Sequence, residues 1–421
     1  MTLWTKDLLL KNTESAENLS ENEIAHVVDF LNENHPFDDF LREKSERKIA
    51  LKNMEETKNL LENATQKYPK VYDFSEIVFD EKSLSKVAFF FTAGGEGQRL
   101  AQSLEKSGME NLHLENFTKA TIHIKDFPEN FGTLMINLSI IKSLSDTHGV
   151  DFPVIISLGP KGSTTQKVIP EEIKAFNNFG LKNLHYISQG ERLHLSEEEK
   201  ISLEIKDGEI KIAKNPDESG GPLVAFYNDK KLINDLKEKG VSKILIVQGT
   251  GIFNPDILKN ISSVKGNHDC YILGLPRHKF EKTDQLGTIE IIEKDGKDTL
   301  RILEAHSIND TTRQIQDPTH TAYLPANSGM YIFDLAFFSN SLPISFYATA
   351  PKEISFSKKL SPKIGYSATD FTTFAKNPAV ILISDKDFAV LKNVENMEDL
   401  STLGKKFGLI TLCEKVKSQI Q

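Results

Sequence analysis

The chain has only two cysteines, Cys270 and Cys413, among its 421 residues. Two thiols form neither a disulfide framework nor a four-thiolate metal site, so we expect the reducing cytoplasm. A broad positive surface is also missing, because 51 basic residues stand against 60 acidic ones and the net charge is −9. This balance argues against nucleic acid as a partner. No apolar run approaches the roughly 20 residues of a membrane span, and the segment MTLWTKDLLLKNTESAENL lacks the apolar centre of a secretory signal.

Two kinds of sequence pattern follow one another along the chain. In roughly the first 80 residues, apolar positions such as Ile24, Val27 and Leu31 recur at helical spacing, which predicts a helical arm or cap over 1–80. From Val87 onward, runs of strand length (VAFFFTA, PVIISLG, LHYIS, ILIVQG, MYIFD) alternate with helical stretches such as TLMINLSIIKSLSD and PEEIKAFNNFG. The alternation predicts an α/β domain over 81–393 with a mostly parallel sheet, followed by a short helical tail over 394–421.

Two further segments alternate apolar and polar residues on either side of an Asp-Gly pair. ISLEIKDGEIKIA turns at Asp207-Gly208, and TIEIIEKDGKDTLRILE turns at Asp295-Gly296. Asp-Gly suits the two-residue turn of a β-hairpin. We therefore expect two antiparallel hairpins inserted into the sheet, an arrangement typical of enzymes that enclose a second substrate.

The segment FFFTAGGEGQRL places Gly94, Gly95 and Gly97 directly after an expected strand, with Arg99 two residues further on. Ligands of open α/β sheets bind at the carboxyl ends of strands. Glycines let backbone N–H groups approach phosphate oxygens, and arginine adds a permanent positive charge. The segment is not the dinucleotide fingerprint, because Leu100 occupies its last position, and no Gly-Lys-Ser/Thr follows to make a P-loop. This pattern alone is compatible with either a tight turn or a phosphate-binding loop.

Read as Ala-Gly-Gly-x-Gly-x-Arg-Leu, the segment resembles the signature loop of sugar-nucleotide pyrophosphorylases. These enzymes transfer a nucleotidyl group from a nucleoside triphosphate to a sugar 1-phosphate. Seven further segments, in order, are similar to those of the eukaryotic-type UDP-N-acetylglucosamine pyrophosphorylases: FTKATIHI, FNNFGLKNLHYISQGE, GEIKIAKNPDESGGPLVAF, HDCYILG, LRILEAHSI, PANSGMYIF and PKIGYSATDFTTFAKNPAVILISDKDFAVLKN. The resemblance covers about Val87 to Asn393 and implies a Rossmann-like, GT-A-like nucleotidyltransferase fold.

The resemblance also implies roles for the matching residues. The catalytic cations would be Arg99, Lys119 and Lys363. The nucleotide would be held by Gly94, Gly95, Gly97, Gln189, Glu218, Gly220, Gly221 and Thr250, with Gln189 contacting uracil. The sugar phosphate would be held by Ser219, Glu304, Asn327 and Lys392. These residue types suit the chemistry, because in-line nucleotidyl transfer needs positioning and neutralised charge, and a glutamine amide matches the donor and acceptor of an imide edge.

The sequence departs from the family pattern where the family holds Mg²⁺ with an aspartate. Thr250 stands at that position, and a neutral hydroxyl is a weak ligand where carboxylates are the usual anchors. Mg²⁺ stays the expected cofactor, with no protein ligand predicted. Three interpretations are open: another acid such as Asp256 binds the metal, the phosphates of UTP and water hold it, or the protein binds nucleotide sugars with little turnover.

Other departures concern the sugar. Glu218 replaces a glycine, and Ala305, Ser367 and Thr369 replace larger aromatic residues, so we expect a differently shaped sugar pocket. The Glu218-Ser219-Gly220-Gly221 segment stands where UDP-glucose pyrophosphorylases carry Gly-His-Gly-Asp, which favours an amino sugar. We therefore expect a uridylyltransferase that converts UTP and N-acetylglucosamine 1-phosphate into UDP-N-acetylglucosamine and pyrophosphate. A UDP-glucose or broad UDP-sugar enzyme, and a catalytically weak nucleotide-sugar-binding protein, are the alternatives.

Two short segments are compatible with one other class of enzyme. SDTHG and GNHDC are similar to metal-binding segments of two-metal phosphoesterases. The first segment follows a helix and the two lie far apart, so His268 and Asp269 are interpreted as loop residues before the strand at Tyr271. The sequence predicts neither the oligomeric state nor a role for the N-terminal helices.

Overall fold

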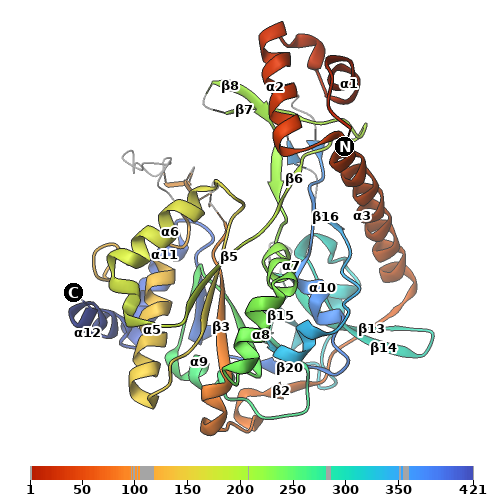
Figure 1. The fold of residues 1–421 in the computed structure, drawn as a ribbon. Helices are drawn as coiled ribbons and strands as arrows, with labels where there is room; N and C mark the ends of the chain where they lie inside the picture. Colours follow the sequence, from red (N-terminus) through yellow and green to blue (C-terminus); the bar gives the residue numbers. More distant parts are fainter. Residues whose placement is uncertain are drawn as a thin grey trace. The chain divides into compact units, whose positions relative to one another are not determined.

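The computed structural model describes residues 2–95, 97, 100, 101, 103, 104, 118–206, 208–280, 286–349, 352, 353 and 360–420. The chain folds as two compact units, and Figure 1 shows the elements of both. Unit 1 comprises Met1–Ala64, Gly190–Gly221 and Pro343–Phe371, and unit 2 comprises Thr65–Gln189, Pro222–Leu342 and Thr372–Gln421. The N-terminal helices therefore share a unit with two segments from within 81–393.

Unit 2 is built on a mixed, mostly parallel sheet with strand order β2-β20-β12-β15-β10-β3-β4-β5. These strands are β2 (Val71–Asp73), β3 (Val87–Thr92), β4 (Val154–Leu158), β5 (Leu184–Ser188), β10 (Lys243–Gln248), β12 (Cys270–Arg277), β15 (Tyr323–Asp334) and β20 (Pro378–Leu382). Along this path, β15 runs antiparallel to β10 and β12, and all other neighbours are parallel. The predicted α/β fold class and the five strands predicted from apolar runs are confirmed.

Both faces of the central strand β3 are covered. Phe89 and Phe91 belong to the apolar cluster that includes residues of α5 (Thr133–His148), whereas Phe90 packs edge-on against Phe226 of α7 (Gly221–Asn228), with ring centroids 5.6 Å apart. Figure 1 shows α5 and α8 (Lys230–Glu238) on opposite sides of the sheet beside β3. A strand buried on both faces must be apolar along its whole length, which is why VAFFFTA reads as a continuous apolar run.

The remaining helices of unit 2 include the predicted tail. That tail forms two helices, α11 (Asn396–Lys406) and α12 (Leu409–Ile420), and α12 packs against α5 through Cys413 and Val416. A two-stranded pair of β11 (Gly251–Phe253) and β21 (Phe388–Val390) lies next to α11. The helices are α6 (Thr164–Ala175), α9 (Pro255–Ser262), α10 (Ala368–Thr373, begun in unit 1), α11 (Asn396–Lys406) and α12 (Leu409–Ile420).

The second predicted hairpin is present in unit 2 as β13 (Thr288–Lys294) and β14 (Lys297–Leu303). Asp295 and Gly296 at its turn have φ of 54° and 72°, the left-handed conformation that a type I′ turn requires. Strand β1 (Thr65–Lys67) pairs with β13. The helical pattern predicted over 1–80 is therefore wrong beyond Asn63, because Pro69 cannot continue a helix and the residues around it form β1 and β2.

The described residues of unit 1 include the N-terminal α-helices and several small strand pairs. The helices are α1 (Lys6–Asn12), α2 (Glu21–Asn34) and α3 (Phe37–Asn63). The strand pairs are β6 (Glu191–Leu193) with β9 (Lys214–Pro216), β7 (Leu203–Lys206) with β8 (Glu209–Ile212), β16 (Tyr347–Ala348) with β19 (Ile364–Gly365), and β17 (Lys352–Glu353) with β18 (Leu360–Ser361). The β7–β8 pair confirms the first predicted hairpin, and Asp207 at its turn lies outside the described residues.

An apolar cluster joins the N-terminal segment of unit 1 to its second segment, Gly190–Gly221. Trp4, Leu31 and Phe40 from the helices pack with Leu193 and Ile201 from the middle of the chain. Among the described residues, none of the helices of either unit combines the length and apolar character needed to cross a bilayer.

Candidate active site

The glycine-rich segment leaves β3 at the carboxyl end of the parallel strands. At Gly94, an added Cβ would lie 3.0 Å from Gln189 Nε2 and 3.0 Å from the backbone nitrogen of Gly159, so the segment is packed closely there. At Gly95, an added Cβ would have no atom of the described residues within 4 Å, so its backbone faces open space in that part of the chain. Gly97 has φ of 77°, a conformation that favours glycine. The segment thus combines close packing on one side with a bare, accessible backbone.

Gln189 follows β5 at the same edge of the sheet. Its backbone N–H donates to the carbonyl oxygen of Leu158, at 3.2 Å, and the residue is only 8% exposed. Within the described part of the chain its side-chain amide forms no hydrogen bond, so the donor and the acceptor are both free for a ligand beside Gly94. The structure brings these two predicted residues together.

The fully buried Thr133, at the start of α5, joins the Lys119 segment to the end of β10. Its hydroxyl donates to the Gly249 carbonyl oxygen at 2.8 Å and lies 3.3 Å from the carbonyl oxygen of Ala120. The Gly249 N–H donates in turn to the carbonyl oxygen of Thr92, at the end of β3. Lys119 is therefore placed near the strand ends where the glycine-rich segment begins.

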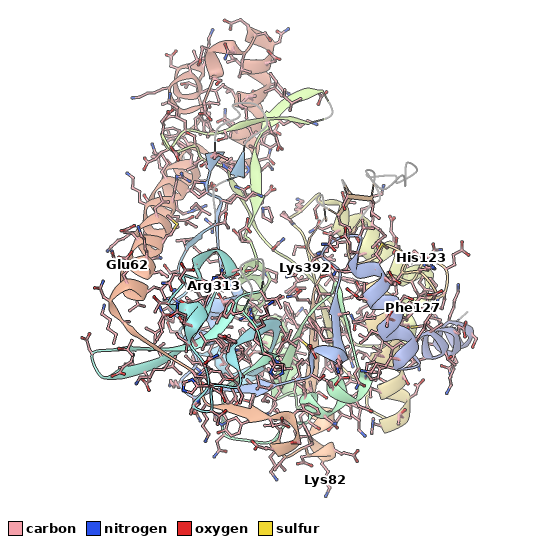
Figure 2. The ribbon with its side chains drawn as sticks, turned by 180° about the vertical axis from the view of Figure 1, so that it is seen from behind. Glu62, Lys82, His123, Phe127, Arg313 and Lys392 are labelled. Atoms are coloured by element: carbon pink, nitrogen blue, oxygen red, sulfur yellow. The ribbon has the colours of Figure 1, made fainter. Side chains whose placement is uncertain are left out.

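Lys392 lies beside Thr250, because the Leu391 N–H donates to the Thr250 carbonyl oxygen at 2.9 Å (Lys392 is labelled in Figure 2). Burial, together with the positive charge of Lys392, lowers the pKa of Lys119 to about 8. The two ammonium groups are therefore close enough to repel one another. A partly buried lysine beside a second, exposed lysine at the strand ends is an arrangement that an incoming polyanion stabilises.

Asn327 and Glu304 come together around Tyr331 of β15. The Asn327 amide donates to the Tyr331 hydroxyl at 2.9 Å, and its Oδ1 accepts from the N–H of Gly329 at 3.0 Å. Burial and the negative charge of Glu304 raise the pKa of Tyr331, although the Asn327 hydrogen bond lowers it. An added Cβ at Gly329 would overlap the amide of Gln248, so this cluster lies next to the end of β10.

The predicted residues Glu218 to Gly221 belong to unit 1. The Gly220 N–H donates to the Tyr366 carbonyl oxygen at 2.8 Å, and the Ser219 hydroxyl accepts from the Ala368 N–H at 3.2 Å. Glu218, which replaces a family glycine, has φ of 57° and so keeps the backbone conformation that glycine favours. The segment is thus packed tightly against 365–368.

Lys363 also belongs to unit 1. Its backbone pairs with Thr349, and its positive charge adds to the burial that lowers the pKa of His194 to about 4. Arg99 lies outside the described residues. The convergence of Arg99, Lys363 and Lys392 around one cavity stays a prediction.

The described residues do not fit a protein-held Mg²⁺ at Thr250. This residue offers a neutral hydroxyl, and its carbonyl oxygen already accepts from Leu391. Asp256 is exposed in the first turn of α9. In the described part of the chain there is no group of three His, Cys, Asp or Glu side chains that could hold a metal ion. Carboxylates are the usual anchors of Mg²⁺, so Thr250 is a poor protein ligand for this ion.

The interpretation of His268 and Asp269 as loop residues is confirmed. The Asp269 carboxylate accepts from the backbone N–H groups of Lys376 and Asn377, at 2.8 and 2.9 Å, and His268 Nδ1 lies 3.1 Å from the Asn377 carbonyl oxygen. His148 ends α5 before Gly149. These groups stabilise local structure, and they give a two-metal phosphoesterase no support.

Sequence reasoning missed Thr133, Gln248 and Tyr331. Each is a common polar residue inside or at the end of a regular element, and no local motif marks it. Their importance comes from the partners that the fold brings to them.

The mixed sheet, with a glycine-rich segment after β3, is the Rossmann-like fold of solved UDP-sugar pyrophosphorylases. The UDP-N-acetylglucosamine pyrophosphorylase of Trypanosoma brucei, solved with an inhibitor, is similar over 95% of this chain and 82% of its own, with a TM-score of 0.61 and 16% identity. A protein of Entamoeba histolytica assigned the same activity is similar over 75% of this chain and 78% of its own, with a TM-score of 0.57 and 18% identity. A variant of the UDP-glucose pyrophosphorylase of Leishmania major, in complex with UDP-glucose, is similar over 79% and 70%, with a TM-score of 0.57 and 13% identity.

The sequence matches no protein-family model and no curated protein. At these identities the structural likeness establishes the fold. The resemblance noted in the sequence is thereby confirmed at the level of the fold.

Proposed function

We propose that the protein is a UTP-dependent sugar-1-phosphate uridylyltransferase, and that its product is UDP-N-acetylglucosamine. The observation that carries the proposal is the arrangement at the strand ends of unit 2. A bare glycine backbone, an amide with free hydrogen-bonding groups and two mutually repelling lysines lie together there, in a chain whose net charge is −9. The fold shared with UDP-sugar pyrophosphorylases supports the same assignment.

In the proposed reaction, a phosphate oxygen of the sugar 1-phosphate attacks the α-phosphorus of UTP in line. The new oxygen–phosphorus bond forms as the bond between the α-phosphorus and the bridging oxygen breaks, and pyrophosphate leaves on the opposite side. Catalysis then depends on positioning and on neutralising charge. Lys119 contacts the triphosphate, and Arg99 and Lys363 stabilise the departing pyrophosphate; the last two assignments rest on the sequence resemblance.

The same proposal assigns the remaining residues to recognition. Gln189 binds the imide edge of uracil, and its position against Gly94 supports a base-binding site beside the glycine-rich segment. Asn327 and Glu304 are suited to sugar hydroxyl and acetamido groups, because each offers an oxygen acceptor and the amide adds a donor. The other assigned residues are Ser219 and Lys392 at the sugar phosphate, and Gly95, Gly97, Glu218, Gly220, Gly221 and Thr250 at the nucleotide.

The test is pyrophosphate release from UTP with a panel of sugar 1-phosphates. We expect release with N-acetylglucosamine 1-phosphate to exceed that with glucose 1-phosphate. Faster release with glucose 1-phosphate would favour the UDP-glucose enzyme, and calorimetric binding of UDP-sugars without release for any sugar would favour a binding protein. The dependence on Mg²⁺ stays a prediction, and the same assay with EDTA checks it.

A further inference from the structure

Arg192 of β6 lies at the centre of a buried ionic network in unit 1. Its guanidinium donates from Nε to Asp217 Oδ1 at 2.6 Å, from Nη2 to the Tyr366 hydroxyl at 2.9 Å, and from Nη1 to the carboxylate of Glu46 on α3. The side chains of Arg192, Asp217 and Glu46 are only 13%, 12% and 15% exposed. Charge-assisted hydrogen bonds that are shielded from water in this way hold a fixed geometry.

Two aromatic rings complete the network. The Cζ atom of Arg192 lies 4.7 Å from the ring centroid of Phe346 and 5.0 Å from that of Tyr366. The planar guanidinium group therefore bonds along its edges and lies over two neighbouring aromatic rings, whose centroids are 5.3 Å apart. A lysine could not reproduce the three-way fork of hydrogen bonds, so this position requires arginine.

The network holds the segment that carries Glu218 to Gly221. Asp217 directly precedes this segment, and its carbonyl oxygen accepts from the Tyr366 N–H at 3.0 Å. The carbonyl oxygen of Tyr366 accepts in turn from the Gly220 N–H at 2.8 Å. Arg192 therefore binds the side chains of Asp217 and Tyr366, and the backbones of these two residues hold the segment through hydrogen bonds.

Glu218 shows why such support matters. Its φ of 57° lies in the left-handed region, which a residue with a side chain adopts at a cost. Strained backbone of this kind persists only where the surrounding structure over-determines it. The bonds from Arg192 to Asp217 and Tyr366 supply that constraint directly beside Glu218.

We propose that Arg192 is a positioning residue for the Glu218–Gly221 segment, and that Glu46 of α3 anchors it. The N-terminal helical region thereby takes part in recognition of the nucleotide sugar. The inference rests on the proposed function, because that function assigns nucleotide and sugar contacts to this segment.

The test uses the full chain and measures initial rates in the direction of pyrophosphorolysis, with UDP-N-acetylglucosamine and pyrophosphate. In Arg192→Lys we expect KM for the UDP-sugar to rise about tenfold or more, with a smaller change in kcat, because the segment is displaced while the cations of unit 2 are untouched. Glu46→Gln should shift KM in the same direction. In the double variant, KM should rise by less than the product of the two single-variant factors, because both changes act through one network.

Arg42→Gln is the matched control, since Arg42 contacts the same Glu46 carboxylate, at 3.6 Å, from an exposed position. Its KM should equal that of the wild type. A lower melting temperature with unchanged KM in both Arg192→Lys and Glu46→Gln would overturn the inference and leave a purely structural role. If Arg192→Lys does not fold, Glu46→Gln alone decides by the same criterion. A wild-type protein that neither binds nor turns over any UDP-sugar would overturn the proposed function itself, and the inference with it.

Discussion

Gly94 and Gly95 are adjacent, yet the structure gives them opposite surroundings, so they form a matched pair of variants. Gly95→Ala adds a methyl group where no atom of the described residues lies within 4 Å and where φ is not in the left-handed region. The free energy of unfolding should therefore change by no more than about 0.5 kcal/mol. If phosphate oxygens lie against this backbone, however, the methyl group occupies their space. We expect UTP affinity to fall about tenfold or more, which corresponds to about 1.4 kcal/mol.

Gly94→Ala should behave differently. The new Cβ would lie 3.0 Å from Gln189 Nε2, 3.0 Å from the Gly159 nitrogen and 3.1 Å from the carbonyl carbon of Leu158. Two of these three atoms belong to the backbone and cannot move far, so overpacking should lower the free energy of unfolding by roughly 1–3 kcal/mol. The Gln189 amide is also pushed aside. Both the melting temperature and the affinity for UTP should fall.

Thermal unfolding and calorimetric titration with UTP measure the two quantities for both variants. A Gly95→Ala protein that melts like the wild type and binds UTP equally tightly would refute the reasoning, because the bare backbone would then have no role in holding the triphosphate. Gly94→Ala serves as the comparison, because its melting temperature and its affinity for UTP should both fall.

Three other perturbations test separate groups. Arg99→Ala should lower kcat about 10²-fold or more, and turnover within a few-fold of the wild type would remove Arg99 from the mechanism. The affinity for UTP should fall as the pH rises through about 8, because Lys119 loses its charge there, and the fall should be absent in Lys119→Arg; titrations between about pH 6 and pH 9 decide this. Glu290 is fully buried, and burial raises the pKa of its carboxyl from the ordinary 4.5 to about 8. As the pH rises, the carboxyl therefore loses its proton in the unfolded chain before it does so in the folded protein. The free energy of unfolding should fall between pH 4.5 and pH 8 for this reason. Glu290→Gln should therefore be more stable than the wild type near pH 8, by about 1–4 kcal/mol in urea unfolding, and an equal pH dependence of the two proteins would contradict the assignment.

Much of unit 2 could be predicted from sequence because its elements follow local rules. Val87 to Phe91 are each at most 1% exposed, and such burial on both faces demands an unbroken apolar run. The Asp295-Gly296 pair marks its hairpin because both residues tolerate positive φ. Strands β1 and β2 were missed, because they are three residues long and lie at the edge of the region with helical spacing.

The candidate site was predictable in part. Gly94, Gln189 and Lys119 stand in recognisable segments, and the structure places them at the same strand ends. Thr133 has no such signal, since its hydroxyl bonds a carbonyl oxygen 116 positions later in the chain. Its role is a consequence of the fold.

Sequence by itself determined the alternation of strands and helices, the bare backbone after β3 and the set of available cations. These properties depend on burial and backbone conformation within a few neighbouring residues. Only the tertiary structure decided that Lys392 lies near Lys119, and that Arg192 meets Glu46 from 146 positions earlier and Tyr366 from 174 positions later. Such long-range contacts form when the packing of many distant segments offsets the conformational entropy lost in ordering them, and no local sequence pattern predicts this.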